Sequence, residues 1–277
     1  MNEVKRDWRG ISGYIIAAFA ITWTVLIGLR ALGVGLEVRA TLGMFGPALA
    51  SVIVRLAGSE GFRDSGLHLP RPGTRHLFLA AYAIPFGALA AAAILSSVFG
   101  LQVWDMSAGV AAAWSAWKFA LALGAVLTIV VGLTMISAFG EELGWRGYLL
   151  PRLLPLGPLR ASIIIGLIWG VWHAPLIVLD GRGFGKGHEL IGLLMFVMLS
   201  TSWSIYLTWL CIRSDSIWPA VLSHATLNVV TSTIFAVFDP KDLIFGSPIG
   251  VLTVLCFLAV DAWLIATGRL NVPSNNP

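Results

Sequence analysis

The chain has 277 residues, of which 57% are hydrophobic and 12% are charged, and its formal net charge is +4. Soluble domains carry roughly 25% charged residues, so this composition excludes a soluble globular protein and indicates an integral membrane protein in a lipid bilayer. The small net charge gives no reason to expect a nucleic-acid partner, and two cysteines cannot build a disulfide framework.

The sequence contains about eight apolar runs that are long enough to cross a bilayer. The second and third contain glycine and an internal proline, which can interrupt a helix. The hydrophobic content leaves no room for a separate soluble domain, so we predict a single all-α membrane domain over residues 1–277, a polytopic bundle of about eight transmembrane helices. In chain order the runs are Ile11–Leu29, Ala40–Leu56, His76–Phe99, Trp117–Phe139, Ala161–Leu179, Leu190–Cys211, Ile217–Phe238 and Ile249–Thr267.

Lysine and arginine in the loops predict the orientation, because cytoplasmic loops carry an excess of them. With the N-terminus in the cytosol, two thirds of the 18 basic residues fall on the cytoplasmic side. We therefore expect a multi-pass protein of the cell membrane with both termini cytoplasmic. The basic loop Ala57–Arg75 and the charged segment Glu141–Arg160 would lie on the same side.

Charged residues follow the fourth apolar run. Glu141 and Glu142 point about 100° apart on a helix, so they cannot share one role. Glu142 and Arg146 are four residues apart, in the order that favours an ion pair. Glu141 has no local partner, and a carboxylate in a cavity of low dielectric suits a general base for water. A solvated helix end with a salt bridge is the alternative interpretation.

His173 lies inside the fifth run. A neutral imidazole can orient a water molecule or bind a metal. Pro175 should free backbone carbonyls nearby and kink the helix. A histidine packed among aromatic side chains is the alternative interpretation.

His224 and Asn228 lie four residues apart in the seventh run, so they share a helix face. Both can donate hydrogen bonds to an oxyanion, as imidazole and amide groups do in acyl-transfer sites. A hydrogen bond between helices is the alternative role for this pair.

The positions of these residues along their predicted spans suggest that they lie at similar depths in the bilayer. At 1.5 Å per residue, His173 lies about 18 Å, His224 about 10 Å and Asn228 about 17 Å from the cytosolic ends of their spans. Glu141 lies at the inner end of the fourth span. We therefore expect all four side chains in the cytosolic half of the bilayer, lining one cavity open to the cytosol.

A base, a water-orienting histidine and two oxyanion donors are the groups needed to hydrolyse an amide without a covalent intermediate. With Glu-Glu-x-x-x-Arg, aromatic-x-x-x-His and His-x-x-x-Asn in this order, the chain resembles the CAAX prenyl protease and bacteriocin-processing family, most strongly over Trp117–Val230. The family includes the type II CAAX prenyl endopeptidases. The resemblance implies an eight-helix fold and an intramembrane endopeptidase (a hydrolase) that acts on peptides or proteins, with or without a lipid group.

The resemblance also implies roles. Glu141 matches the general base and His173 the histidine that positions the water. His224 and Asn228 match the oxyanion pair. Glu142 and Arg146 match a supporting pair, of which the arginine can also meet the substrate. The second motif begins with Trp169 where the family usually has phenylalanine, so we expect the pocket shape to differ and the chemistry to survive.

Metal content and catalysis are the open points. Family members have been described both as metalloproteases and as metal-free glutamate enzymes. Glu141, His173 and His224 are residue types that ligate zinc, but asparagine is a poor zinc ligand, and we expect no cofactor. A non-catalytic membrane adaptor or bacteriocin-immunity protein of the same fold is the alternative function. A transporter with a proton-linked relay is a third, although we find no inverted repeat.

Overall fold

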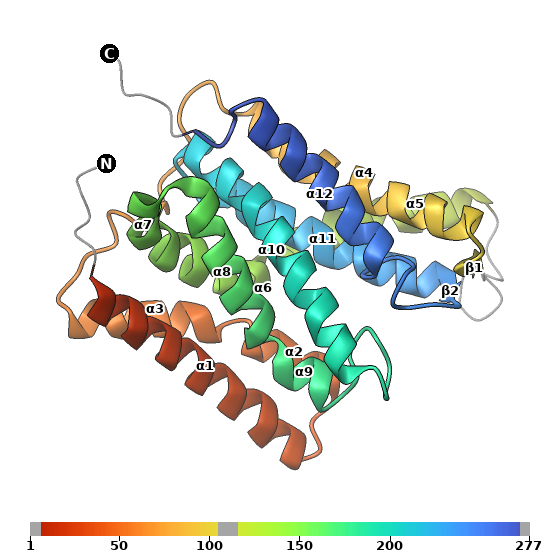
Figure 1. Ribbon diagram of the computed structural model, residues 1–277, viewed down its shortest axis with the longest axis horizontal. Coiled ribbons are helices and arrows are strands. Elements are labelled where there is room, and N and C mark those ends of the chain that lie inside the picture. The colour runs from red at the N-terminus through yellow and green to blue at the C-terminus, as the bar shows by residue number, and fades with distance from the viewer. Residues whose placement is uncertain (1–6, 105–115, 272–277) are drawn as a thin grey trace.

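The computed structural model describes residues 7–104 and 116–271, which form a bundle of helices with one short two-stranded sheet (Figure 1). The predicted all-α membrane bundle is confirmed. The elements in chain order are α1 (Trp8–Ala31), α2 (Leu36–Gly43), α3 (Gly46–Ala57), α4 (His76–Val98), β1 (Gln102–Trp104), α5 (Ala116–Ala125), η2 (Val126–Val130), α6 (Val131–Gly144), η3 (Trp145–Leu149), α7 (Leu150–Leu153), η4 (Leu154–Leu156), α8 (Pro158–Trp172), α9 (Ala174–Val178), α10 (Glu189–Ser214), α11 (Trp218–Val237), β2 (Phe238–Pro240) and α12 (Val251–Ala266).

Six helical segments of the described chain are long and apolar enough to cross a membrane. The other two predicted runs correspond to α8 and α12, which are apolar but only 15 and 16 residues long. The chain is therefore a multi-pass membrane protein with eight apolar helical segments in its described part, of which two are short. The six longer segments are Trp8–Ala31, Leu36–Ala57, His76–Val98, Ala120–Leu156, Glu189–Ser214 and Trp218–Val237.

The fourth predicted span is wrong at its end. We expected the helix to stop at Phe139 and the segment Glu141–Arg160 to be a cytoplasmic loop. The helix instead continues to Leu156, with π-helical turns at η2 and η3, and Glu141 and Arg146 are buried in it. Apolar side chains that follow the charged motif pack in the core, which favours a continued helix over a loop.

Two glycines bring α6 close to the junction of α2 and α3. A Cβ atom on Gly144 would lie 2.5 Å from the Cβ of Pro47, and one on Gly140 would lie 2.7 Å from the carbonyl oxygen of Met44. Both distances are too short for a real contact. The backbones can approach this closely only because these positions lack a side chain.

The fifth predicted span breaks where Pro175 predicts a kink, so that prediction is confirmed. α8 ends at Trp172 and α9 begins at Ala174, which leaves His173 at the junction. Proline has no N–H to donate, so the ladder of backbone hydrogen bonds cannot run through this point.

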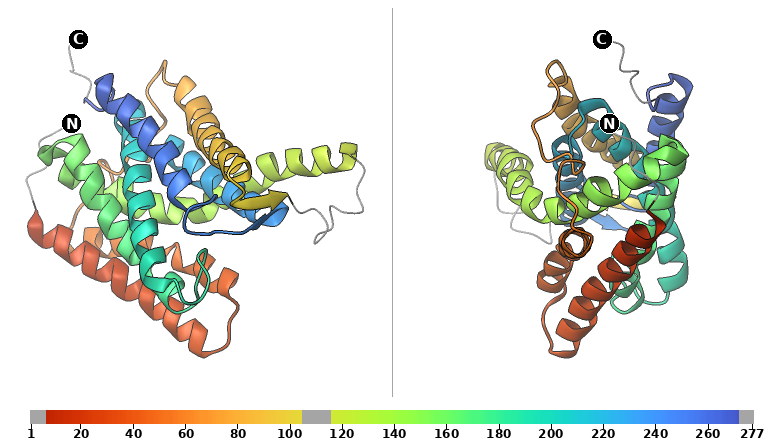
Figure 2. Two further views of the ribbon diagram at one scale, coloured as in Figure 1. Left: turned by 45° about the vertical axis from the view of Figure 1, so that its right-hand side comes forward. Right: turned by 90° about the vertical axis from the view of Figure 1, so that its left-hand side faces the viewer.

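The helices alternate between two ends of the bundle. α1 begins and α12 ends at one end, together with the turn between α10 and α11, and we call this the terminal end. At the opposite end, which we call the loop end, lie α9, the connection 179–188 and the antiparallel pair β1–β2 (Figures 1 and 2). Figure 2 also shows α5 extending away from the other helices.

Candidate active site

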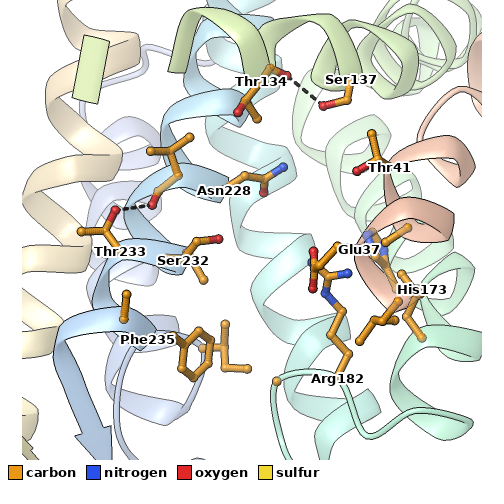
Figure 3. Close-up of a pocket in the computed structure, with 18 of the residues that line it drawn as sticks. Glu37, Thr41, Thr134, Ser137, His173, Arg182, Asn228, Ser232, Thr233 and Phe235 are labelled. Carbon is orange, nitrogen blue, oxygen red and sulfur yellow. Dashed lines mark hydrogen bonds and ion pairs between the residues drawn. The ribbon is translucent and has the colours of Figure 1, made fainter. Parts of the chain in front are cut away.

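A cavity of about 1350 Å³ opens between α2, η2, α6, α9 and α11. Glu141, His173, His224 and Asn228 all line it, so the structure brings together the four residues that three separate motifs predict. Figure 3 shows Asn228 extending from α11 toward this space, with His173 on the opposite wall.

Glu141 is 2% exposed and lies on α6. Its carboxylate oxygen Oε2 accepts a hydrogen bond from the indole Nε1 of Trp169 on α8, at 2.6 Å. The sequence shows no local partner for this glutamate, and its real partner comes from 28 positions further along the chain. The only sequence signal for Trp169 is its departure from the phenylalanine that is usual in the resembling family.

Glu142 belongs to a separate buried cluster. Its Oε1 accepts hydrogen bonds from Arg146 Nη1 at 3.1 Å and from His224 Nδ1 at 2.8 Å. All three side chains are almost completely buried, and Glu142 and Arg146 are not among the residues that line the cavity. The predicted ion pair is therefore confirmed. The guanidinium of Arg146 lies over the Trp169 ring, 4.7 Å from the ring centre, and a contact of Arg146 with the substrate stays a prediction.

His173 is held by its own helix. Its Nδ1 lies 2.9 Å from the carbonyl oxygen of Trp169. A carbonyl oxygen only accepts, so Nδ1 carries the proton and a neutral imidazole keeps a free lone pair on Nε2. The rings of Trp172 and Phe196 pack against it at 4.6 Å and 4.5 Å between ring centres. These contacts fix the plane of the imidazole at the cavity wall.

His224 and Asn228 share one face of α11, as their spacing predicts. Nδ1 of His224 is engaged by Glu142, which leaves Nε2 as its second hydrogen-bonding atom. The Asn228 carboxamide lines the cavity, and it makes no hydrogen bond within the described residues. Its N–H groups therefore have no competing acceptor in this part of the protein.

The described residues do not fit a bound metal ion. Within 7–104 and 116–271, no three His, Cys, Asp or Glu side chains are grouped so that they could hold one. We therefore derive no step through a metal.

The cavity extends from Glu141 toward the loop end. Its lining there includes Glu37 at the start of α2, residues 180–183 and 185, and Pro240 of β2. The sequence predicts that the cavity opens at the end of the bundle where α1 begins and α12 ends, whereas its lining residues extend to the loop end (Figure 1). Glu141 lies within a continuous helix rather than at its end, and His173 follows the last residue of α8, so both lie closer to the loop end than we expected.

Ion pairs attach the connection 179–188 to α1 and α2 at the mouth of the cavity. Asp180 accepts hydrogen bonds from Arg39 at 2.7 Å and from Arg30 at 3.1 Å. The hydrogen bond from Arg39 is the main reason that the pKa of the Asp180 carboxyl lies below its usual range. Arg182 pairs with Glu37 at 3.3 Å across the same mouth (Figure 3).

Residues 124–230 match the family model described as Type II CAAX prenyl endopeptidase Rce1-like. This part of the chain is therefore Rce1-like, and the predicted resemblance is confirmed there. A stretch of 119 residues is 31% identical to CAAX prenyl protease 2 of Methanococcus maripaludis. That similarity covers 40% of this chain and 43% of the relative, so the chain matches less than half the length of that protein. All six predicted site residues lie within the Rce1-like region.

Proposed function

We propose that this protein is an intramembrane endopeptidase in which Glu141 activates a water molecule to hydrolyse a peptide bond. The observation that carries the proposal is the meeting of Glu141, His173, His224 and Asn228 on the wall of one cavity. The name of the matching relative, CAAX prenyl protease 2, supports the same chemistry.

The geometry supports the following sequence of steps. Oε1 of Glu141 takes a proton from the water, while Nε2 of His173 accepts a hydrogen bond from its second hydrogen. The water oxygen bonds to the carbonyl carbon of the substrate, and the carbonyl oxygen becomes an oxyanion. The C–N bond then breaks as Glu141 returns the proton to the leaving nitrogen. No covalent intermediate with the protein forms.

Asn228 and His224 act on the oxyanion. The Asn228 carboxamide supplies one N–H donor. His224 already donates Nδ1–H to Glu142, so Nε2 is a donor only in the protonated ring. The buried carboxylates of Glu141 and Glu142 carry two negative charges, and the guanidinium of Arg146 carries one positive charge. A protonated His224 neutralises the remaining negative charge.

The cavity suits an extended peptide with an apolar group. Its volume of about 1350 Å³ is larger than the roughly 300–1000 Å³ of a typical small-molecule site. Val126, Val130, Val229 and Phe235 contribute apolar walls from η2 and α11. The substrate class we infer is therefore a peptide or protein that carries a prenyl group, presented from the bilayer.

The test is a cleavage assay on the purified protein, with a peptide library synthesised with and without a farnesyl thioether on cysteine. Replacing Glu141 by Gln should lower turnover by about 10²–10⁴, since general base catalysis is lost. The matched control is Glu189→Gln, which removes the negative charge of a half-buried glutamate that does not line the cavity and should leave turnover unchanged. A chelator should change nothing. Cleavage by Glu141→Gln at the parent rate would refute the proposal and favour a non-catalytic adaptor.

A further inference from the structure

Trp169 contacts four of the six predicted site residues. Its indole N–H donates to Glu141, and its carbonyl oxygen accepts from His173. Its ring lies beneath the guanidinium of Arg146, at 4.7 Å, and edge-on to the ring of His224, at 5.3 Å between centres. The side chain is 4% exposed, so these contacts are made out of water.

The hydrogen bond to Glu141 is the contact in this set that a plain hydrocarbon ring cannot make. It joins Nε1 to Oε2 at 2.6 Å, in a buried setting where a hydrogen bond to a charged group is strong. Because Oε2 is engaged, Oε1 is left as the free oxygen of a carboxylate that lines the cavity. Oε1 has no hydrogen bond within the described residues.

We propose that the indole N–H of Trp169 is a positioning group, which holds Oε2 of Glu141 so that Oε1 is the oxygen presented to the water. This inference rests on the proposed hydrolysis. Trp169 does not touch the reacting atoms itself. The indole N–H of Trp169 sets the rotation of the Glu141 carboxylate. The carbonyl oxygen of Trp169 keeps the proton of His173 on Nδ1.

A buried indole in this bundle does not require a hydrogen-bond partner. Trp203 on α10 is fully buried, packs against Tyr206 and Phe257, and has no hydrogen-bond acceptor for its Nε1 within the described residues. It does not line the cavity. Trp203→Phe is therefore the matched control, because it removes the same atoms from an equally buried position away from the site.

The experiment measures kcat, KM and the melting temperature of the parent, Trp169→Phe and Trp203→Phe, with the best peptide from the library. For Trp169→Phe we expect kcat to fall about 10- to 100-fold, with KM within about twofold of the parent, because the lost contact acts on the base and not on the substrate. Both substitutions should lower the melting temperature to a similar extent. Trp203→Phe should leave kcat unchanged.

If Trp169→Phe does not fold, 3-benzothienylalanine introduced at position 169 keeps the shape of the ring and replaces the N–H with sulfur. The same loss of kcat is expected. A parent-like kcat in either folded variant, or a rise in KM alone, would overturn the positioning role while Glu141→Gln still reports on the hydrolysis. If the parent cleaves no peptide, the proposed function itself fails, and the two failures are thereby distinguished.

Discussion

Glu141 and Glu142 are adjacent in the chain, yet their carboxylates have different partners. Glu141 lines the cavity and accepts a hydrogen bond from Trp169. Glu142 does not line the cavity, and it accepts hydrogen bonds from Arg146 and His224. The helical angle between neighbours predicts this division from the sequence alone. The individual partners across helices cannot be predicted in this way, because no local spacing relates position 141 to 169 or 142 to 224.

The two donors on α11 should respond differently to truncation. Asn228→Ala removes a side chain with no partner among the described residues, so we expect turnover to fall about 10²–10³-fold with no loss of stability. His224→Ala should abolish turnover and also destabilise the protein by about 3 kcal/mol, because Glu142 loses a buried partner. Kinetics together with thermal unfolding in detergent measure both effects. Equal destabilisation by the two variants would contradict this assignment.

At the scale of the elements, hydropathy predicts which segments are helical better than it predicts where they end. The eight predicted runs all correspond to helices, and Pro175 marks the break after α8. The fourth helix exceeds its prediction because its last turns carry charges that pair inside the protein. A window of mean hydropathy cannot distinguish such a buried charged turn from a polar loop.

The close approach of α6 to the α2–α3 junction gives a prediction for this contact. Gly144→Ala should destabilise the protein by about 1–3 kcal/mol, since the added methyl group would overlap Pro47. The matched control on the same helix is Gly132→Ala, where the new Cβ would meet nothing within 4 Å. That variant should be neutral or stabilising by up to about 1 kcal/mol. Chemical denaturation in mixed micelles measures the difference, and equal effects would refute the packing role.

At the scale of the whole molecule, the mouth of the cavity lies at the end of the bundle opposite to the start of α1 and the end of α12 (Figure 1). The loop charges still predict cytoplasmic termini. We therefore propose that the mouth of the cavity, at the loop end, faces the outer side of the membrane. The sequence alone predicts both on one side, because the charged motif follows an apolar run and is typical of a helix end.

Cysteine labelling tests this orientation. Lys186 is exposed at the loop end, and Arg213 is exposed near the terminal end of α10. A membrane-impermeant maleimide applied to intact cells should label Lys186→Cys, and it should label Arg213→Cys only after permeabilisation. The native Cys211 and Cys256 are buried and half-buried, and the parent protein is the control for them. The reverse pattern would place the mouth of the cavity in the cytosol.

The helical segment that carries Glu141 runs for 37 residues, from Ala120 to Leu156. At the rise of an α-helix this is about 55 Å, against a hydrocarbon core of about 30 Å. A helical segment longer than the hydrocarbon core is accommodated by tilting, by kinking or by local thickening of the bilayer. We therefore expect the tilt of the helix that carries Glu141 to change with the thickness of the membrane.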